Sequence, residues 1–365
     1  MGHIGKLAMI IIAAANLFFI VLLLMAAYSP YVNAVEHPLR ASMGLTFPIF
    51  LFINFCFFVF FLLIKYKFAV LPLAGFLLCT PQIRTYFPIN SRTKHVPEES
   101  IKILSYNIML FDHFKKIDGK NPILTYIQES NADIICLQEF VPNGNKNRLT
   151  HTEVDAALKA YPYKSFNRIG KKHKDGTNGM VCYSKFPILS SKPVAYESDH
   201  NGSVVHEIKI GNDTITLINN HLESNKLSTE DKVLYEGMIA DPEARKVKRG
   251  MIHLLSKLQE AVAIRAIQAK AVAAEIAASK HPYIIVCGDF NDSPLSNAHR
   301  IISADLDDAF TKSGRGPGIS YNRNKFYFRI DHILISKNLK AYNCTVDRSI
   351  KDSDHYPIWC YISKK

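Results

Sequence analysis

The sequence predicts an α/β protein whose sheets carry helices on both faces, preceded by two or three transmembrane helices. Two features of the 365-residue chain lead to this fold class. Residues 1–83 are almost wholly apolar, and from residue 101 onward short β-rich runs alternate with helical segments. The roughly 270 residues that follow the apolar part are enough for one large α/β domain with a sizeable core.

Two apolar runs near the N-terminus are long enough to cross a bilayer. The run Leu7–Tyr28 has no charged residue and exceeds the roughly 18 residues that indicate a span. A secretory signal peptide is the alternative, but the apolar core of such a peptide is usually only about 7–15 residues long. The second run, Leu45–Ile64, is also uncharged. We therefore predict a transmembrane anchor in residues 1–83, with spans at about 7–28 and 45–64.

A third apolar run decides on which side of the membrane the following domain lies. This run, Phe68–Cys79, is marginally short for roughly 30 Å of hydrocarbon. It fits either a short third span at about 66–83 or a segment in the membrane interface. The positive-inside rule assigns Lys6, Lys65 and Lys67 to the cytoplasm. Three spans then place the domain outside the cytoplasm and two leave it inside; we favour three.

We therefore expect an integral protein of the plasma or inner membrane, with the domain on the non-cytoplasmic side. The seven cysteines argue mildly against that side. Their number is odd and no CxxC spacing occurs, so we interpret them as buried small hydrophobic residues and not as disulfides. Free cysteines are typical of a reducing compartment.

The remaining chain divides into a polar linker, residues 84–100, and a domain, residues 101–365. The β-rich runs predict strands at Ile101–Tyr106, Asp133–Gln138, Gly179–Ser184, Ser203–Ile210, Thr214–Asn219, Tyr283–Cys287, Phe326–Ser336 and Pro357–Ile362. Helices are predicted at Asn121–Ser130, Val154–Ala160, Met251–Ser279 and Asn297–Ser303. The charged stretch Asn225–Arg249 lacks strand-like alternation, and we interpret it as a partly helical excursion.

Polar residues recur at the ends of these predicted strands. They are Asn107 after the first strand, Glu139 after the second, His221 after the fifth, Asp289 and Asn291 after the sixth, and Asp354 and His355 before the last. Each could be a turn or a solvated strand end. In α/β sheets, however, strand ends line the usual substrate crevice, so the repeated pattern predicts one polar site.

The residue types in this pattern suit chemistry at phosphate. Carboxylates bind Mg²⁺ through oxygen, usually one or two of them together with waters and substrate phosphate. Two histidines can position a nucleophile and stabilise charge on phosphate oxygens. Asp331 falls within the predicted strand Phe328–Leu334, where a carboxylate is costly unless it is paired. His355 is its natural partner.

Six motifs in this order resemble the endonuclease/exonuclease/phosphatase superfamily. They are ILSYN at 103–107, LQEF at 137–140, NNHLES at 219–224, GDFND at 288–292, RIDHILIS at 329–336 and SDHYPI at 353–358. The superfamily includes abasic-site endonucleases, pancreatic-type deoxyribonuclease, neutral sphingomyelinases and inositol polyphosphate 5-phosphatases. The resemblance covers about residues 100–365.

The resemblance implies a four-layered α/β/β/α sandwich that cleaves phosphate esters with Mg²⁺ or Mn²⁺. The metal ligands that it implies are Glu139 and Asn107, with Asp354 as an additional carboxylate. The catalytic residues that it implies are His221, Asp289, Asn291, Asp331 and His355. Some members have an Asp two residues after the first Asn, but this chain has Met109 there. The number of metals and the identity of the general base stay open.

The resemblance also implies roles for the catalytic residues. Asp289 and Asn291 align the nucleophilic water and the phosphate, His221 contacts the phosphate oxygens, and Asp331 holds His355 as the second catalytic histidine. Two further features are similar to the family. Asn178 precedes a Gly-led strand that ends in Ser and Lys, and Arg265 and Gln268 lie one turn apart in the long predicted helix, where a solvated helix face explains them equally well.

The leading hypothesis is a membrane-anchored, metal-dependent phosphodiesterase or nuclease. A phosphodiesterase or phosphatase for lipid headgroups is the alternative, and a non-catalytic membrane protein that binds phosphorylated ligands is a minor one. The expected partners are a phosphate-ester substrate, nucleic acid or lipid headgroup, and the bilayer. The basic segment Lys171–Lys174 could contact a nucleic-acid backbone or anionic lipid, or could be a solvated turn.

Overall fold

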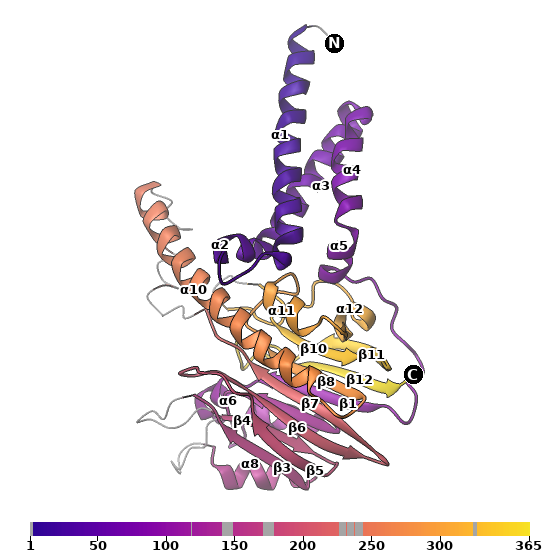
Figure 1. Cartoon of the computed structure of the whole chain (residues 1–365), viewed down its shortest axis with the longest axis vertical. Helices are drawn as coiled ribbons and strands as arrows, with labels where there is room; N and C mark the ends of the chain where they lie inside the picture. Colours follow the sequence, from indigo (N-terminus) through magenta and orange to yellow (C-terminus); the bar gives the residue numbers. More distant parts are fainter. Residues whose placement is uncertain are drawn as a thin grey trace.

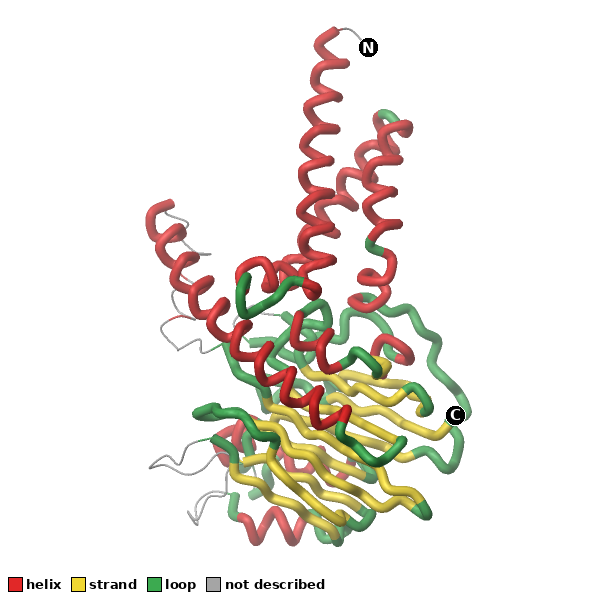
Figure 2. The backbone as a smooth tube through the Cα atoms, viewed as in Figure 1, coloured by secondary structure: helices red, strands yellow, loops and turns green. Residues whose placement is uncertain are grey.

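The computed structural model describes residues 3–117, 119–140, 149–170, 179–225, 231, 237, 244–323 and 327–365. From residue 101 onward, it has two six-stranded sheets packed face to face, with helices on their outer faces. Figures 1 and 2 show these layers below the N-terminal helices. The predicted four-layered α/β/β/α sandwich is confirmed.

The first sheet has the strand order β11-β12-β1-β2-β4-β3. Its strands are β1 (Ile101–Asn107), β2 (Ile134–Gln138), β3 (Tyr163–Arg168), β4 (Gly179–Ser184), β11 (Leu339–Val346) and β12 (Ile358–Lys364). The central strands β1 and β2 run parallel, so their C-terminal ends meet at one edge, where Asn107 pairs with Gln138.

The second sheet has the strand order β5-β6-β7-β8-β10-β9. Its strands are β5 (Ile188–Pro193), β6 (Gly202–Ile210), β7 (Asp213–His221), β8 (Tyr283–Asp289), β9 (Leu306–Asp308) and β10 (Asp331–Ser336). The central strands β7 and β8 are again parallel, and His221 pairs with Asp289 at their C-terminal ends. Each sheet thus delivers two parallel strand ends to one place.

Three apolar layers hold the sandwich together. The inner faces of both sheets form the central layer, to which Ile103 and Leu217 belong. Helices α7 (Pro122–Glu129) and α8 (His151–Ala157) bury apolar side chains on the outer face of the first sheet. Helices α10 (Ala244–Ala277) and α11 (Asn297–Ile302) cover the second sheet. Because alternate strand residues face opposite layers, both faces of the central strands are apolar.

The N-terminal helices form a bundle that rises from the domain (Figure 1). They are α1 (His3–Tyr28), η1 (Ser29–Tyr31), α2 (Pro38–Ala41), η2 (Ser42–Thr46), α3 (Phe47–Ile64), η3 (Tyr66–Ala69), α4 (Val70–Leu78) and α5 (Thr80–Tyr86). By length and composition, two helices could cross a membrane, Gly5–Tyr31 and Pro38–Ile64. The pair Tyr66–Leu78 and Thr80–Tyr86, bent by 66°, could be a third span.

The lower end of this bundle packs directly on the domain. Asn297 Nδ2 on α11 donates hydrogen bonds of 2.9 Å to the carbonyls of Pro30 and Val32. Leu295 joins an apolar cluster with residues of α1, α3 and α5, and a Cβ at Gly44 would lie only 1.9 Å from the Leu295 carbonyl oxygen. The bundle is therefore seated on the loop that follows β8.

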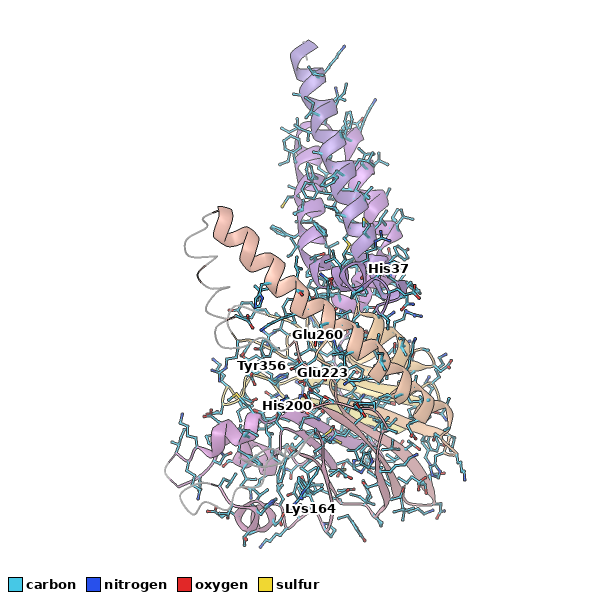
Figure 3. The ribbon with its side chains drawn as sticks, turned by 60° about the vertical axis from the view of Figure 1, so that its left-hand side comes forward. His37, Lys164, His200, Glu223, Glu260 and Tyr356 are labelled. Atoms are coloured by element: carbon cyan, nitrogen blue, oxygen red, sulfur yellow. The ribbon has the colours of Figure 1, made fainter. Side chains whose placement is uncertain are left out.

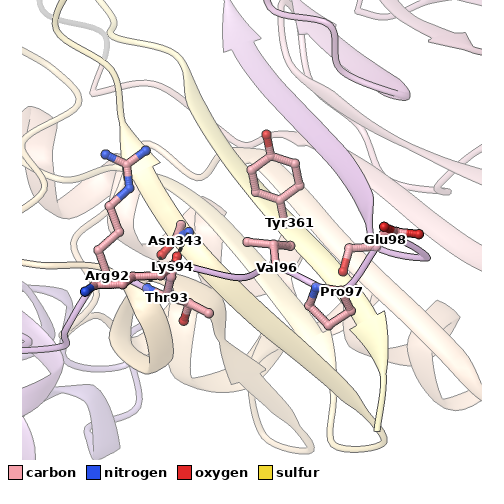
Figure 4. Close-up of a pocket in the computed structure, with 9 residues that line it drawn as sticks. Arg92, Thr93, Lys94, Val96, Pro97, Glu98, Asn343 and Tyr361 are labelled. Atoms are coloured by element: carbon pink, nitrogen blue, oxygen red, sulfur yellow. Dashed lines mark hydrogen bonds between the residues drawn. The ribbon is translucent and has the colours of Figure 1, made fainter.

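The linker crosses the far side of the first sheet. The side chain of Asn343 accepts from the backbone N–H of Thr93 and donates to its carbonyl oxygen. Between the linker and the sheet lies a pocket of about 730 Å³, with Arg92 at one end and Tyr361 of β12 beside it (Figure 4). Ser100, which directly precedes β1, also lines this pocket. The pocket therefore lies at the N-terminal end of β1, whereas Asn107 lies at its C-terminal end.

The predicted strands are confirmed with shifts of one or two residues, with one larger correction. The seventh strand, β10, begins at Asp331, so this carboxylate opens the strand and does not lie inside it as predicted. The cause is local: the backbone N–H groups of Ile330 and Asp331 both donate to Ser320 Oγ. All seven cysteines are free and six are buried, as expected. Most of the excursion Asn225–Arg249 lies outside the described residues.

The remaining helices connect these layers. They are the short helices α6 (Met109–Phe114) and α12 (Ala309–Ser313). Asp308 caps α12 through its side chain, which accepts from the backbone N–H of Thr311.

Candidate active site

Four parallel strand ends bring the predicted site residues together between the two sheets. The side chain of Asn107, at the end of β1, donates 3.1 Å hydrogen bonds to Glu139 Oε1, after β2, and to Asp289 Oδ2, at the end of β8. Gln138 on the first sheet donates to Asn219 Oδ1 on the second at 2.7 Å, with both side chains fully buried. This contact fixes the distance between the two halves of the site.

One carboxylate oxygen, Asp289 Oδ2, is the centre of the site. Besides Asn107, it lies 3.2 Å from Asn291 Nδ2, 3.7 Å from His221 Nε2 and 3.6 Å from His355 Nε2. Asp289 is 1% exposed. Burial and the charge of Asp331 raise the pKa of Asp289 to about 6, against the opposing effect of His355. A carboxylate in this range can exchange a proton near neutral pH.

The two site histidines are in opposite protonation states. His355 Nδ1 lies 2.8 Å from Asp331 Oδ2. Although burial opposes it, the charges of Asp331 and Asp289 raise the pKa of His355 well above its ordinary value, so the ring is cationic. Burial lowers the pKa of His221, so this ring is neutral. The pairing of His355 with Asp331 is as the sequence predicted.

Two site residues adopt left-handed backbone conformations. Glu139 has φ of 55° and Asn291 has φ of 51°. This region costs a non-glycine residue about 1–2 kcal/mol, and such strain clusters at functional sites. In Asn291 the turn lets the backbone N–H donate to Asp289 Oδ1 at 2.8 Å while Nδ2 donates to the Leu222 carbonyl at 2.9 Å.

The oxygen ligands at the rim of the site fit a hard divalent cation. The side chain of Glu139 is 31% exposed, beside Asn107 and 3.8 Å from His221. Asn107 turns its amide nitrogen toward both carboxylates, and its Oδ1 accepts from the Met109 backbone at 3.2 Å. The amide would rotate to bind a cation through oxygen. Asp354 directly precedes His355, and its charge contributes to the raised pKa of His355.

Another compact group of ligand atoms lies deeper in the site. Asp289, Asp331 and His355 have carboxylate and imidazole atoms within 4.8 Å of one another. The ligand atoms of this group are already engaged, because His355 Nδ1 lies 2.8 Å from Asp331 Oδ2 and Asp289 Oδ2 accepts from the side chains of Asn107 and Asn291. We therefore assign this group to proton positioning and the cation to the side of Glu139.

Sequence reasoning left the second layer of the site open, because a family resemblance and a solvated helix face explained Arg265 and Gln268 equally well. Arg265 on α10 is fully buried; its Nε donates to Asp292 at 3.0 Å and its Nη1 to the Glu223 carbonyl at 2.9 Å. Gln268, one turn on, accepts from the Glu223 backbone. The solvated helix face considered for both residues is therefore wrong. One signal in the sequence pointed to this burial: Arg265 is a charged residue on the face of the long predicted helix where apolar residues recur.

Tyr321 is a further residue that sequence reasoning missed. Its ring lies edge-on to His355, with 5.2 Å between the ring centroids. Figure 3 shows Glu223 and Tyr356, sequence neighbours of the two site histidines, on one side of the molecule below Glu260 of α10. Asn178 and the basic segment Lys171–Lys174 lie outside the described residues.

Solved structures share this fold at low sequence identity. The human Nocturnin catalytic domain with a bound sulfate anion matches with a TM-score of 0.52 and 16% identity, over 76% of this chain and 96% of that chain. ANGEL2, described as a 2′,3′-cyclic phosphatase and in complex with adenosine-2′,3′-vanadate, matches with a TM-score of 0.50 and 16% identity, over 75% and 99%. These likenesses show the fold.

Family models identify the chain more directly. A model of a domain of unknown function matches residues 9–86, which form the N-terminal bundle. No curated protein matches the chain. The model of the Endonuclease/Exonuclease/phosphatase family matches residues 104–355, well over half of the chain and all of the strand ends described above. The chain therefore belongs to the endonuclease/exonuclease/phosphatase family of phosphate-ester hydrolases.

Proposed function

We propose that this protein is a membrane-anchored, divalent-metal-dependent phosphodiesterase. The observation that carries the proposal is the set of groups around Asp289 Oδ2, which two histidines and two side-chain amides approach within 3.7 Å. One buried carboxylate, one cationic and one neutral imidazole, and fixed amides form the arrangement that attack of water on a phosphate ester requires.

The chain's own residues supply the proton chemistry. Asp289 accepts a proton from the attacking water, and Asn291 fixes the orientation of that carboxylate through its backbone and side chain. His355, held cationic by Asp331, stabilises negative charge on the phosphate oxygens. His221 donates a hydrogen bond to the same oxygens. Glu139, with Asn107 and Asp354, would hold Mg²⁺ or Mn²⁺, which when bound polarises the phosphate ester.

The seating of the bundle favours lipid headgroups as a second candidate substrate class. The loop after β8 contains Asn291 and Asp292, and the bundle contacts this loop at Leu295 and the first residue of α11, Asn297. The site is thus held close to the end of helices that are apolar enough to cross a membrane. Phosphodiesters at a bilayer surface therefore lie close to the candidate active site, whereas a nucleic acid would have to reach it from solution.

The same contacts support a topology with three crossings. The connection between α1 and α3 is bound to the domain through Pro30 and Gly44, and the end of α5 is bound to it through Thr85, which accepts from Arg329. If α1 and α3 both cross, the chain must cross back between residues 66 and 86 to reach the domain again. The domain and the N-terminus then lie on opposite sides, and the positive-inside rule makes the domain non-cytoplasmic.

A substrate panel tests the activity. The full-length protein in detergent is assayed with Mg²⁺ or Mn²⁺ on a bis-aryl phosphodiester, plasmid DNA, sphingomyelin, phosphoinositides and nucleotides. We expect metal-dependent turnover that Glu139→Ala reduces by about 10²–10⁴. Glu129→Ala, which removes an exposed glutamate at the end of α7, should leave the rate unchanged. Turnover that is independent of metal, or equal in the two variants, would contradict the proposal.

A matched pair of cysteines tests the topology. In a Cys56→Ser background, Lys94→Cys lies in the linker and Lys65→Cys at the far end of α3. A membrane-impermeant maleimide should label Lys94→Cys in intact cells and Lys65→Cys only after lysis. The reverse pattern would place the domain in the cytoplasm.

A further inference from the structure

A second cluster of ligand atoms lies on the outer face of the second sheet, away from the candidate active site. It consists of His299 on α11, Asp308 at the end of β9 and His332 on β10, which are 5%, 8% and 1% exposed. Their ligand atoms all lie within 4.8 Å of one another. Because side chains alternate along a strand, His332 points away from the face that Asp331 occupies.

The hydrogen bond of His332 determines which of its nitrogens is free. His332 Nε2 lies 3.0 Å from the carbonyl oxygen of Asp292. A carbonyl can only accept, so Nε2 carries the proton. The Nδ1 lone pair then remains, and it is buried without a hydrogen-bond partner. A metal-bound histidine typically donates its other ring N–H to a backbone carbonyl in this way.

Two members of the cluster have shifted pKa values. Burial, His299 and Arg329 lower the pKa of His332 well below its ordinary value, so the ring is neutral. Although burial opposes it, the hydrogen bond from His299 and the charge of Arg329 hold the pKa of Asp308 well below its usual range. The cluster therefore offers three buried ligand groups, two imidazole rings and one carboxylate.

The spacing of the cluster suits a tetrahedral ion. His299 Nε2 lies 3.3 Å from Asp308 Oδ2. Ligands about 2.0–2.1 Å from zinc are separated by about 3.3 Å along a tetrahedron edge. The rings of His299 and His332 lie 4.6 Å apart between centroids, and all three ligand atoms of the cluster lie within 4.8 Å of one another.

Arg329 is the competing positive charge. Its guanidinium donates to the Thr85 carbonyl and lies 4.5 Å above the Phe310 ring. In the described part of the chain, it forms no ion pair with Asp308, whose Oδ2 has His299 as its hydrogen-bond partner. Arg329 does not donate a hydrogen bond to His332 Nδ1, because Nδ1 of His332 and both Nε and Nη1 of Arg329 are buried without a hydrogen-bond partner.

We propose that His299, Asp308 and His332 bind Zn²⁺ at a site separate from the catalytic cation. Two imidazoles and one carboxylate are a donor set typical of zinc, with a fourth position for water. The ion would join α11, which carries the bundle contact through Asn297, to β10, which carries Asp331. It would also hold the Asp292 carbonyl in place through His332.

Zinc binding by the full-length protein tests this site. The protein in detergent is stripped with a chelator, titrated with Zn²⁺ alone and desalted, and the bound metal is measured by mass spectrometry. A Glu139→Ala background reduces binding at the catalytic centre. We expect that background to retain about one Zn²⁺ per chain. Adding Asp308→Asn should weaken binding at least about tenfold, because the anionic ligand is lost.

The control variants separate zinc binding from folding. Asp308→Asn keeps an oxygen that can cap α12. Asp307→Asn removes the neighbouring partly exposed carboxylate and should retain the zinc. Zinc-edge X-ray absorption of the Glu139→Ala protein should show imidazole neighbours, which also decides the matter if Asp308→Asn does not fold. Absence of bound zinc, a zinc shell without imidazole, or equal affinity with and without Asp308 would overturn the proposal.

Discussion

At the residue scale, burial decides what each titratable group of the site can do. Asp289, Asp331 and His355 are all at least 95% removed from solvent, so each charge is set by its neighbours. Asp331 favours the cation on His355, and that cation in turn lowers the pKa of Asp289. A substitution at one of these three residues therefore changes the pKa values of its neighbours in the site.

Asp331→Asn is expected to reduce kcat by about 10²–10⁴. The amide no longer stabilises the His355 cation, so the pKa of His355 falls. Since the cationic form is then lost at lower pH, the alkaline limb of the pH–rate profile should move to lower pH. The profile of the Asp307→Asn control should keep its position. An unchanged alkaline limb in Asp331→Asn would contradict this role.

A second residue-scale prediction concerns pH-dependent stability. Burial lowers the pKa of His206 from 6.5 to about 4. The folded state therefore resists protonation, and the stabilising contribution present above pH 6.5 is lost as the pH falls toward 4. We expect the free energy of unfolding to decrease by about 3 kcal/mol over that window through this residue.

Denaturant unfolding followed by the fluorescence of the single tryptophan, Trp359, measures this effect. His206→Gln should flatten the pH dependence in that window. His200→Gln removes an exposed histidine and should not. Equal pH dependence in the two variants would show that other groups dominate.

At the element scale, the sequence predicted the eight inner strands and missed the four edge strands. Those four, β3, β5, β9 and β11, are the outermost strands of the two sheets. β5 has one partly buried and five exposed positions, and β3 has none that is buried. An edge strand is paired on one side and solvated on the other, so β3 and β5 carry little of the apolar pattern from which strands are predicted. This reason does not apply to β11, which is buried at five of its eight positions and has a register shift between Tyr342 and Thr345.

The candidate site shows the same division. Strand ends mark Asn107, Glu139, His221 and Asp289 because the sudden change from apolar to polar is visible along the chain. Arg265 shows no such change, because a charged residue on a long helix resembles its solvated neighbours. Its burial depends on Asp292, 27 residues away, and no local pattern reports that contact.

Gly288→Ala tests the close packing of β7 against β8. Gly288 has φ of 133°, and a Cβ there would lie 2.0 Å from the Asn220 carbonyl oxygen. We expect a loss of about 3–5 kcal/mol in the free energy of unfolding. Gly211→Ala, with φ of 58° and no atom within 4 Å, should cost about 1–2 kcal/mol. Equal losses measured by denaturation would show that β7 can move aside.

At the scale of the whole molecule, the contact between bundle and domain is the feature that distinguishes this chain from a tethered enzyme. Polar contacts through Asn297 and apolar contacts through Leu295 meet where the loop after β8 enters α11. A second apolar cluster joins Ala34 and Ala41 to Val262 and Ala266 of α10. Both helices that cover the second sheet, α10 and α11, therefore take part in the contact.

Gly44→Ala is expected to separate the bundle from this loop, because the new Cβ would meet the Leu295 carbonyl oxygen at 1.9 Å. Hydrogen exchange of residues 293–302 should accelerate at least about tenfold. Gly75→Ala is the matched control within the bundle, since its Cβ would meet only Ile20 and Leu23 side chains at 3.4 Å or more. Equal exchange in both variants would mean that the contact carries little free energy.

The seating of the bundle on α11 also has a geometric consequence. The active site of an enzyme on a flexible linker can reach substrates at many different distances from the bilayer surface. An active site that is fixed to the transmembrane helices stays at one distance from the membrane surface as the protein diffuses laterally. Selection among phosphate esters would then depend on how far each scissile bond stands from the lipid surface, in addition to how well its leaving group fits.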